Sequence, residues 1–395
     1  MPNNITEEIK PCSDHELHGL LSRIVEDPSF PAIISFIYPD RSLEEMERQL
    51  LSYTSVRDYQ LGIMIDAIKR IIALTMSEFS YGGTEYLKKG RGHLFVANHR
   101  DIILDAFLLQ YVLALNGHET TQITIGSNLI DRPLMAAIAR VNKMFTIERG
   151  GGKREFYDNL AQVSSYIRQV VVERNESVWI AQHNGRTKNG VDTTDPALVK
   201  MLAMSGGDDP VRALKELQIV PLCISYEMEP CDAMKARELI SKARDGEYHK
   251  GEDEDFKSVL TGVLQPKGKV HLEICKPLEP CELEAAAGRK STDRQEACNS
   301  GIDRQDDCAP SRCDNDFFKN VASIIDRRIR EAYRPMATNY MACDLLSGTR
   351  NHAQHYSTTQ LDDFVEYIDK ASTIDDATDA MRRQLLQIYA APVEQ

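Results

Sequence analysis

The sequence predicts an α/β protein with a largely parallel central sheet that is flanked by helices. From Gly92 onward, short runs typical of strands alternate with stretches in which apolar residues recur at helical spacing. Two of the runs, 94–97 and 220–224, are continuously apolar, which is typical of strands buried on both faces of a parallel sheet. Helical spacing also dominates the regions before and after these strands, so we expect helical regions at both ends of the chain.

Length and composition indicate a soluble globular protein. The chain has 395 residues, of which 42% are hydrophobic and 27% charged, enough for one large domain with an accessory region. The formal net charge of −13 argues against nucleic acid as a partner, because phosphate backbones bind basic surfaces. The N-terminus lacks a basic segment followed by an apolar one, and no apolar run reaches the roughly 20 residues that span a bilayer. We therefore expect a cytoplasmic protein, with any membrane contact peripheral.

The nine cysteines show no paired Cys-x-x-Cys spacing. Four of them gather in one polar stretch at irregular intervals, and no histidine accompanies them there. We interpret them as free thiols in a reducing compartment rather than as a zinc site, and we predict no metal. These four are Cys281, Cys298, Cys308 and Cys313.

Residues 1–84 form the predicted N-terminal helical region. Apolar residues recur at helical spacing over 42–76, and the pair Gly82-Gly83 then ends the pattern. Such a stripe most often packs against a core, but the helix over 61–76 is also a candidate for membrane contact. The apolar side chains available for that contact are Ile63, Met64, Ile68, Ile71, Ile72 and Met76.

Residues 85–280 form the predicted α/β domain. The six expected strands cover 93–98, 122–125, 144–148, 177–181, 219–226 and 269–274. Helical patterns lie between them, at about 103–116, 132–141, 154–175, 196–204 and 210–217.

Residues 281–315 differ from the rest of the chain. They are polar and charged, and a short segment at 292–298 recurs in similar form at 302–308. Without an apolar period they cannot pack a core, so we predict a mobile insertion without a catalytic role. Helical spacing resumes after it, and residues 316–395 are expected to form C-terminal helices that pack on the α/β domain.

The segment from His93 to Asp105 carries the most informative pattern. An apolar strand ends in Asn98-His99, and Asp105 follows just inside the next predicted helix. Side chains at the carboxyl edge of a parallel strand face the crevice in which open α/β sheets bind their ligands. A neutral imidazole there can remove a proton from an alcohol, while a carboxylate fixes its tautomer and stabilises the imidazolium. Taken alone, however, such a pair more often has a structural role.

Three further blocks follow in order. A predicted strand leads to Arg149, whose planar donor fork suits phosphate oxygens. The strand over 177–181 leads into Asn-Gly-Arg-Thr at 184–187. The last block, 219–227, is a hydrophobic strand with an early proline. Each block alone also fits an ordinary interpretation, as a surface arginine or a buried core strand.

Together, the four blocks resemble the motifs of the glycerol-3-phosphate and lysophosphatidate acyltransferase superfamily over residues 85–276. The resemblance implies the glycerolipid acyltransferase fold, with His99 as the catalytic base and Asp105 as its partner. It also implies that Arg149 and Arg186 hold the phosphate of the acceptor. The implied substrate-binding set is Arg149, Asn184, Gly185, Arg186 and Thr187.

The sequence departs from the family pattern at two places. Five residues stand between His99 and Asp105, where the family has four. Asp101 is an alternative partner for the imidazole, but its position suits a helix cap better, and we choose Asp105. The usual glutamate of the third block is missing, and His183 or Asn184 stands in its place. Either side chain can hydrogen-bond a substrate hydroxyl, but neither supplies a negative charge.

The reaction that the resemblance implies is direct acyl transfer in phospholipid biosynthesis. The donor is acyl-CoA or acyl carrier protein, and the acceptor is a hydroxyl of glycerol-3-phosphate or 1-acylglycerol-3-phosphate. Apart from the thioester co-substrate, no cofactor is implied. Backbone N–H groups at the start of the helix after His99 are the expected donors to the oxyanion. Because acceptor and product are amphipathic, peripheral contact with the inner face of a membrane is also implied.

Other interpretations remain open at this point. The acceptor can be another lipid alcohol, such as an ornithine lipid or a lysophospholipid. A non-catalytic lipid-binding relative is a further alternative, which the missing glutamate favours. An ordinary α/β hydrolase is disfavoured because the sequence holds no G-x-S-x-G nucleophile motif.

Overall fold

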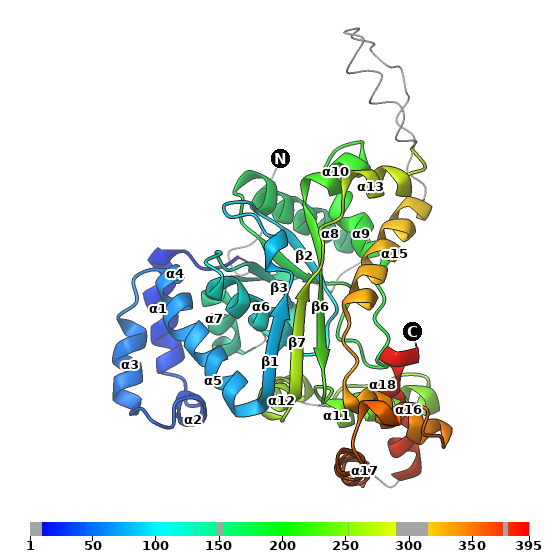
Figure 1. The fold of residues 1–395 in the computed structure, drawn as a ribbon. Coiled ribbons are helices and arrows are strands. Elements are labelled where there is room, and N and C mark those ends of the chain that lie inside the picture. Colours follow the sequence, from blue (N-terminus) through cyan, green and yellow to red (C-terminus); the bar gives the residue numbers. More distant parts are fainter. Residues whose placement is uncertain are drawn as a thin grey trace.

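A seven-stranded sheet runs through the centre of the protein (Figure 1). The computed structural model describes residues 10–130, 132–147, 153–251, 253–289, 315–373 and 378–394. Within these residues the strand order is β1–β7–β6–β2–β5–β3–β4. The strands are β1 Met76–Gly82, β2 Leu94–Ala97, β3 Gln122–Gly126, β4 Met144–Ile147, β5 Val178–Ala181, β6 Ile219–Tyr226 and β7 Gly268–Ile274.

The pairing of the strands confirms the predicted α/β fold with a largely parallel sheet. Neighbouring strands run parallel in each pair except β6–β7, which is antiparallel. β2 lies in the middle, with Leu94 opposite Val178 of β5 on one side and Ile219 of β6 on the other. Every residue of β2 and of β6 is buried, as the continuous apolar runs predict.

Helices cover both faces of the sheet, because successive side chains of a strand point to opposite faces. Leu94 and Val96 of β2 enter one core, and Phe95 and Ala97 enter the other. The first core is closed by α8 Lys153–Arg168, its π-helical extension Gln169–Glu173, α9 Pro196–Ala203, α10 Pro210–Glu216, α13 Pro280–Ala286 and α15 Asn315–Ala332. The second is closed by α5 Ile65–Thr75 and α6 Leu104–Leu115.

The N-terminal helices form a separate core beside the sheet, to which Leu17, Phe30 and Met46 contribute. These helices are α1 Asp14–Val25, α2 Phe30–Ile37, α3 Leu43–Leu51 and α4 Val56–Tyr59, with α7 Pro133–Val141 against them. A π-helical stretch, Gln60–Met64, joins α4 to α5.

The remaining helices follow β6 in the chain. Short 3-10 turns also occur at Thr84–Tyr86, Ser127–Leu129 and Ala353–His355. α16, α17 and α18 share a core with α11, next to the end of β6 (Figure 1). Their bounds are α11 Asp232–Asp245, α12 Glu254–Leu264, α16 Ala337–Ser347, α17 Thr358–Ser372 and α18 Thr378–Glu394. No helix of the described segments is long and apolar enough to cross a bilayer.

The prediction of a helical region over 1–84 is wrong for residues 76–82. Residues Met76–Gly82 form β1, which pairs with β7 at the edge of the sheet. The strand escaped sequence-based prediction because edge exposure removes the apolar run: most of its side chains are exposed or half-buried. The apolar stripe over 61–76 belongs to the core, since Ile63, Met64, Ile68 and Ile71 are buried. These four side chains are therefore not available for contact with a membrane.

The predicted insertion, 281–315, falls largely outside the described residues, which stop at 289 and resume at 315. Its first residues differ from the prediction, because α13 continues to Ala286 and Leu283 is buried against the first core. A glutamate capping box at Glu279 and Glu282 and a proline in the first turn account for a helix there.

Gly83 directly follows β1 and lies against the backbone of β7, so a substitution there tests the packing of this sheet edge. Its φ is +77°, and an added Cβ would lie 1.8 Å from the carbonyl oxygen of Ile274 in β7. We expect Gly83→Ala to lower the free energy of unfolding by about 2–4 kcal/mol, because left-handed strain adds to a backbone clash. Gly90, with a φ of +73° and nothing within 4 Å, is the control. Gly90→Ala should cost only about 1 kcal/mol in denaturant unfolding; equal losses would contradict the packing of β1.

Candidate active site

The end of β2 is held from both sides at the carboxyl edge of the sheet. Oδ1 of Asn98 accepts from the backbone N–H of Ile224 at 2.8 Å, and Nδ2 of Asn98 donates to the Ile224 carbonyl at 3.0 Å. On the other side, the backbone N–H of Thr187 donates to the His99 carbonyl at 2.7 Å. The backbone of His99 is thus fixed at the edge where ligands of open α/β sheets bind.

His99 and Asp105 are in hydrogen-bond contact. Nδ1 of His99 lies 3.0 Å from Oδ2 of Asp105, which stands in the first turn of α6. The Asp105 side chain is fully buried, whereas that of His99 is 13% exposed. Because the carboxylate can only accept, Nδ1 carries the proton of a neutral imidazole and Nε2 presents its lone pair. No other described residue makes a hydrogen bond with Nε2, so this nitrogen can accept a proton from a substrate.

The carboxylate of Asp105 is saturated by donors. Its Oδ2 also accepts from the backbone N–H groups of Arg100 at 2.6 Å and Asp101 at 2.9 Å. Its Oδ1 accepts from the hydroxyl of Tyr226 at 2.8 Å. Burial, together with the charge of Asp105, holds the pKa of Tyr226 well above its ordinary value, so this hydroxyl stays a donor. These donors fix the orientation of the Asp105 carboxylate.

Asp101 caps α6 and does not contact the imidazole, which is the arrangement preferred from the sequence. Its Oδ1 accepts from the backbone N–H groups of Ile103 at 2.9 Å and Leu104 at 2.8 Å. This cap closes the turn between β2 and α6, and the extra residue of the His-Asp spacing lies within that turn. The departure from the family spacing therefore leaves the contact of His99 with Asp105 intact.

The segment after β5 also reaches this edge. Thr187 is buried, and its Oγ1 donates to Oδ1 of Asp192 at 2.8 Å. Nε2 of His183 lies 3.0 Å from the same Oγ1 and its Nδ1 lies 3.2 Å from the carbonyl of Asn184. Burial lowers the pKa of His183, and the nearby His99 acts in the same direction. The residue in place of the family glutamate thus supports the loop of the third block.

Arg186 carries a free donor at this site. Its Nη1 is buried and has no hydrogen-bond partner among the described residues. Burial raises the pKa of the Cys231 thiol, and the charge of the nearby Arg186 guanidinium opposes that rise. The carboxylate of Asp255 also lies near this guanidinium. A buried guanidinium N–H without a partner is costly, and an anionic ligand would satisfy it.

The other predicted substrate-binding residues have different positions. Asn184 is exposed, and Gly185 is half-buried with a φ of +79°, so it forms the turn that brings Arg186 inward. Arg149 lies outside the described residues. Within the described part of the chain, no cluster of three or more His, Cys, Asp or Glu side chains could hold a metal ion.

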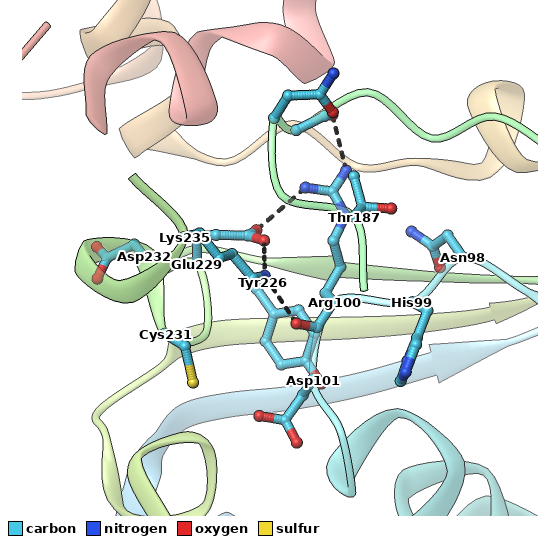
Figure 2. A network of polar contacts seen from close by, with 12 residues as sticks. Asn98, His99, Arg100, Asp101, Thr187, Tyr226, Glu229, Cys231, Asp232 and Lys235 are labelled. Atoms are coloured by element: carbon cyan, nitrogen blue, oxygen red, sulfur yellow. Dashed lines mark hydrogen bonds and ion pairs between the residues drawn. The ribbon is translucent and has the colours of Figure 1, made fainter. Parts of the chain in front are cut away.

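Sequence-based reasoning missed a group of buried charges behind the His99 loop (Figure 2). Figure 2 shows the guanidinium of Arg100 pointing away from the His99 ring, toward Glu229. Arg100 pairs with Asp192 at 2.6 Å and with Glu229 at 3.2 Å. Burial disfavours its charge, yet these carboxylates hold its pKa well above the ordinary value. Charged residues in loops are usually exposed, so only the position of Arg100 next to His99 offered a signal.

Gly262 of α12 tests the cap of α6. An added Cβ there would lie 2.1 Å from Oδ2 of Asp101, while one at Gly19 of α1 would meet nothing within 4 Å. Alanine usually stabilises a helix over glycine by about 0.5–1 kcal/mol, which we expect for Gly19→Ala. Gly262→Ala should instead destabilise by about 1–3 kcal/mol, because Asp101 must move. If thermal denaturation shows that both variants are stabilised, the tight packing of Asp101 is contradicted.

Comparisons with known proteins bear on the chemistry of this site. Residues 78–225 match a family model described as Acyltransferase. A crystal structure of the 1-acyl-sn-glycerophosphate (LPA) acyltransferase PlsC from Thermotoga maritima is similar over 80% of this chain and 97% of that chain, at 14% identity and a TM-score of 0.36. No curated protein matches the chain. The segment that carries both His99 and Asp105 is therefore the one that the acyltransferase family model matches, and it spans residues 78–225.

Proposed function

We propose that this acyltransferase moves a fatty acyl group from acyl-CoA or acyl carrier protein to a hydroxyl of glycerol-3-phosphate or 1-acylglycerol-3-phosphate. The observation that carries the proposal is the 3.0 Å contact of His99 with Asp105, which leaves Nε2 open at the carboxyl edge of the sheet. The unpartnered Nη1 of Arg186 supports an anionic acceptor.

The proposed reaction has no covalent enzyme intermediate. The acceptor hydroxyl oxygen attacks the thioester carbonyl carbon, and its proton passes to Nε2 of His99. A new carbon–oxygen bond forms as the carbon–sulfur bond breaks, and the imidazolium returns the proton to the leaving thiolate. Asp105 stabilises the imidazolium through Nδ1. No cofactor other than the thioester takes part in this scheme.

Four backbone N–H groups in the turn after His99, where donors to the oxyanion are expected from the sequence, have other partners. The backbone N–H groups of Arg100 and Asp101 donate to Asp105, and those of Ile103 and Leu104 donate to Asp101. These four groups define the loop and the cap, so they are not free to bind an oxyanion. The N–H groups of this turn and helix start therefore serve mainly to hold Asp105 and Asp101.

We also propose that the protein works in the cytoplasm, in peripheral contact with the inner face of a membrane, because its acceptor and product are amphipathic. The buried side chains of 61–76 do not support that stripe as the contact. An assay that compares substrate in vesicles with substrate dispersed in detergent would test membrane contact.

His99→Gln tests the base. General-base catalysis is worth about 10²–10⁴-fold, so we expect kcat to fall by about that factor with unchanged folding. The assay offers labelled palmitoyl-CoA and palmitoyl carrier protein with glycerol-3-phosphate and lysophosphatidate side by side. His249, whose side chain is 83% exposed, gives the control His249→Gln, which should keep full activity. If His99→Gln kept the turnover of the wild type, the mechanism would be contradicted. If the wild type itself showed no turnover, a non-catalytic lipid-binding relative would be favoured.

Arg186→Gln tests recognition of the phosphate. Charge-assisted hydrogen bonds contribute about 1.5–3 kcal/mol, so KM for a phosphorylated acceptor should rise about 10–100-fold. An acceptor without a phosphate should be almost unaffected. Lys188, two residues away, is engaged by Glu238, and Lys188→Gln is therefore the matched control. Equal effects on both acceptors, or better turnover of an ornithine lipid or lysophospholipid by the wild type, would point to a different lipid alcohol.

A further inference from the structure

A closed set of four buried charges stands behind the His99 loop. Nζ of Lys235 lies 2.6 Å from Oε1 of Glu229, whose Oε2 lies 3.2 Å from Nη1 of Arg100. Arg100 also contacts Asp192 at 2.6 Å. The side chains of Arg100 and Lys235 are each 1% exposed. Two cations thus face two carboxylates, and the set is neutral, as burial requires.

This set holds the catalytic loop through its backbone as well as through a side chain. Nζ of Lys235 donates to the carbonyl oxygen of Arg100 at 2.8 Å, while the N–H of Arg100 donates to Asp105 at 2.6 Å. Asp192 accepts from Nδ2 of Asn98 at 2.9 Å. The residues before and after His99 are therefore tied to the same four charges, as the dashed contacts in Figure 2 illustrate for Arg100, Glu229 and Lys235.

A tyrosine of α18 contacts this set directly. The hydroxyl of Tyr389 in α18 accepts from the backbone N–H of Glu229 at 3.1 Å and donates to Oδ2 of Asp232 at 2.7 Å. Tyr367 of α17 donates to the same oxygen at 2.6 Å. Burial and the charge of Asp232 hold the pKa of Tyr389 well above its ordinary value, so it remains a donor to Asp232. Both helices lie outside residues 78–225, the matched acyltransferase segment.

We propose that Glu229, Lys235 and Tyr389 are positioning residues for catalysis: through Arg100 they fix the loop that aims His99 and Asp105, and their balanced charges set the potential at His99. The C-terminal helices are thereby part of the acyltransferase machinery rather than an appendage. This inference rests on the proposed function in that His99 is taken to act as the base. None of the three residues needs to touch a substrate.

The first test compares two tyrosines. Tyr389→Phe and Tyr367→Phe each remove one hydrogen bond to Asp232, but only the first removes the contact with Glu229. We expect Tyr389→Phe to lower kcat about 3–10-fold at unchanged KM, the factor that corresponds to one typical hydrogen bond. Tyr367→Phe should keep the wild-type kcat even where its melting temperature falls by as much. Equal kcat in the two variants would overturn the role of Tyr389.

The second test changes the sign of the buried charge. Glu229→Gln leaves an excess positive charge, which disfavours the imidazolium, so protonation of His99 should move to lower pH by roughly 0.5–1 unit. Lys235→Met leaves an excess negative charge and should move it upward. The double variant Glu229→Gln with Lys235→Met is balanced again and should return toward the wild type. The other titratable groups near His99 stay unchanged: Asp105 contacts its ring, Tyr226 donates to Asp105, and His183 lies near the ring.

Two readouts separate this inference from the proposed function. The first is the acid side of the pH profile of kcat/KM, and the second is the titration of the His99 ring by NMR, which needs no turnover. A protein that shows no acyl transfer but gives opposite NMR shifts in the two single variants would refute the function and keep the positioning role. In an active enzyme, the inference would be overturned if the His99 titration moved in the same direction in both single variants, or did not move. Loss of packing alone would not move the titration in opposite directions in the two variants. If one single variant does not fold, the other and the double variant decide the outcome.

Discussion

The structure of the site depends on one buried carboxylate. Asp105 is fully buried in α6, where an unsatisfied charge would cost several kcal/mol, and four donors compensate it: His99, Tyr226 and two backbone N–H groups. Those two N–H groups belong to the residues that immediately follow His99, so the charge that orients the imidazole also folds the loop that presents it. The acyltransferase site is in this sense built before any substrate binds.

The buried charges behind the loop have a similar logic. Burying Arg100 and Lys235 carries a desolvation cost that their partners Glu229 and Asp192 roughly offset, so the set contributes little to overall stability. The set instead restricts the loop of His99 to a single arrangement, because any shift of the loop would leave a buried charge unpaired. The same set connects the sheet to α18, because Glu229 contacts Tyr389, which lies 160 residues further along the chain. A domain matched over 78–225 thus relies on contacts outside that range.

Much of this could be predicted from the sequence, and the failures have physical reasons. The apolar runs of β2 and β6 mark buried parallel strands, and His99 and Asp105 could be paired because Asp101 suits a cap. β1 was missed because an edge strand shows no continuous apolar run. Tyr226, Glu229 and Lys235 come near His99 only through the strand order and the turn after β6, which no local pattern records. Arg186 could be proposed from its motif, but its burial depends on the turn at Gly185.

By accepting from Nδ1, Asp105 selects the tautomer of His99 in which Nε2 is the base. The most direct measurement is the ¹⁵N spectrum of selectively labelled histidine, with His99 assigned by substitution and recorded where its ring is neutral. We expect a proton on Nδ1 and a bare Nε2, together with a loss of this preference in Asp105→Asn, whose amide can donate. A proton found on Nε2 of the wild-type ring, or a spectrum unchanged by Asp105→Asn, would show that Asp105 does not select the tautomer.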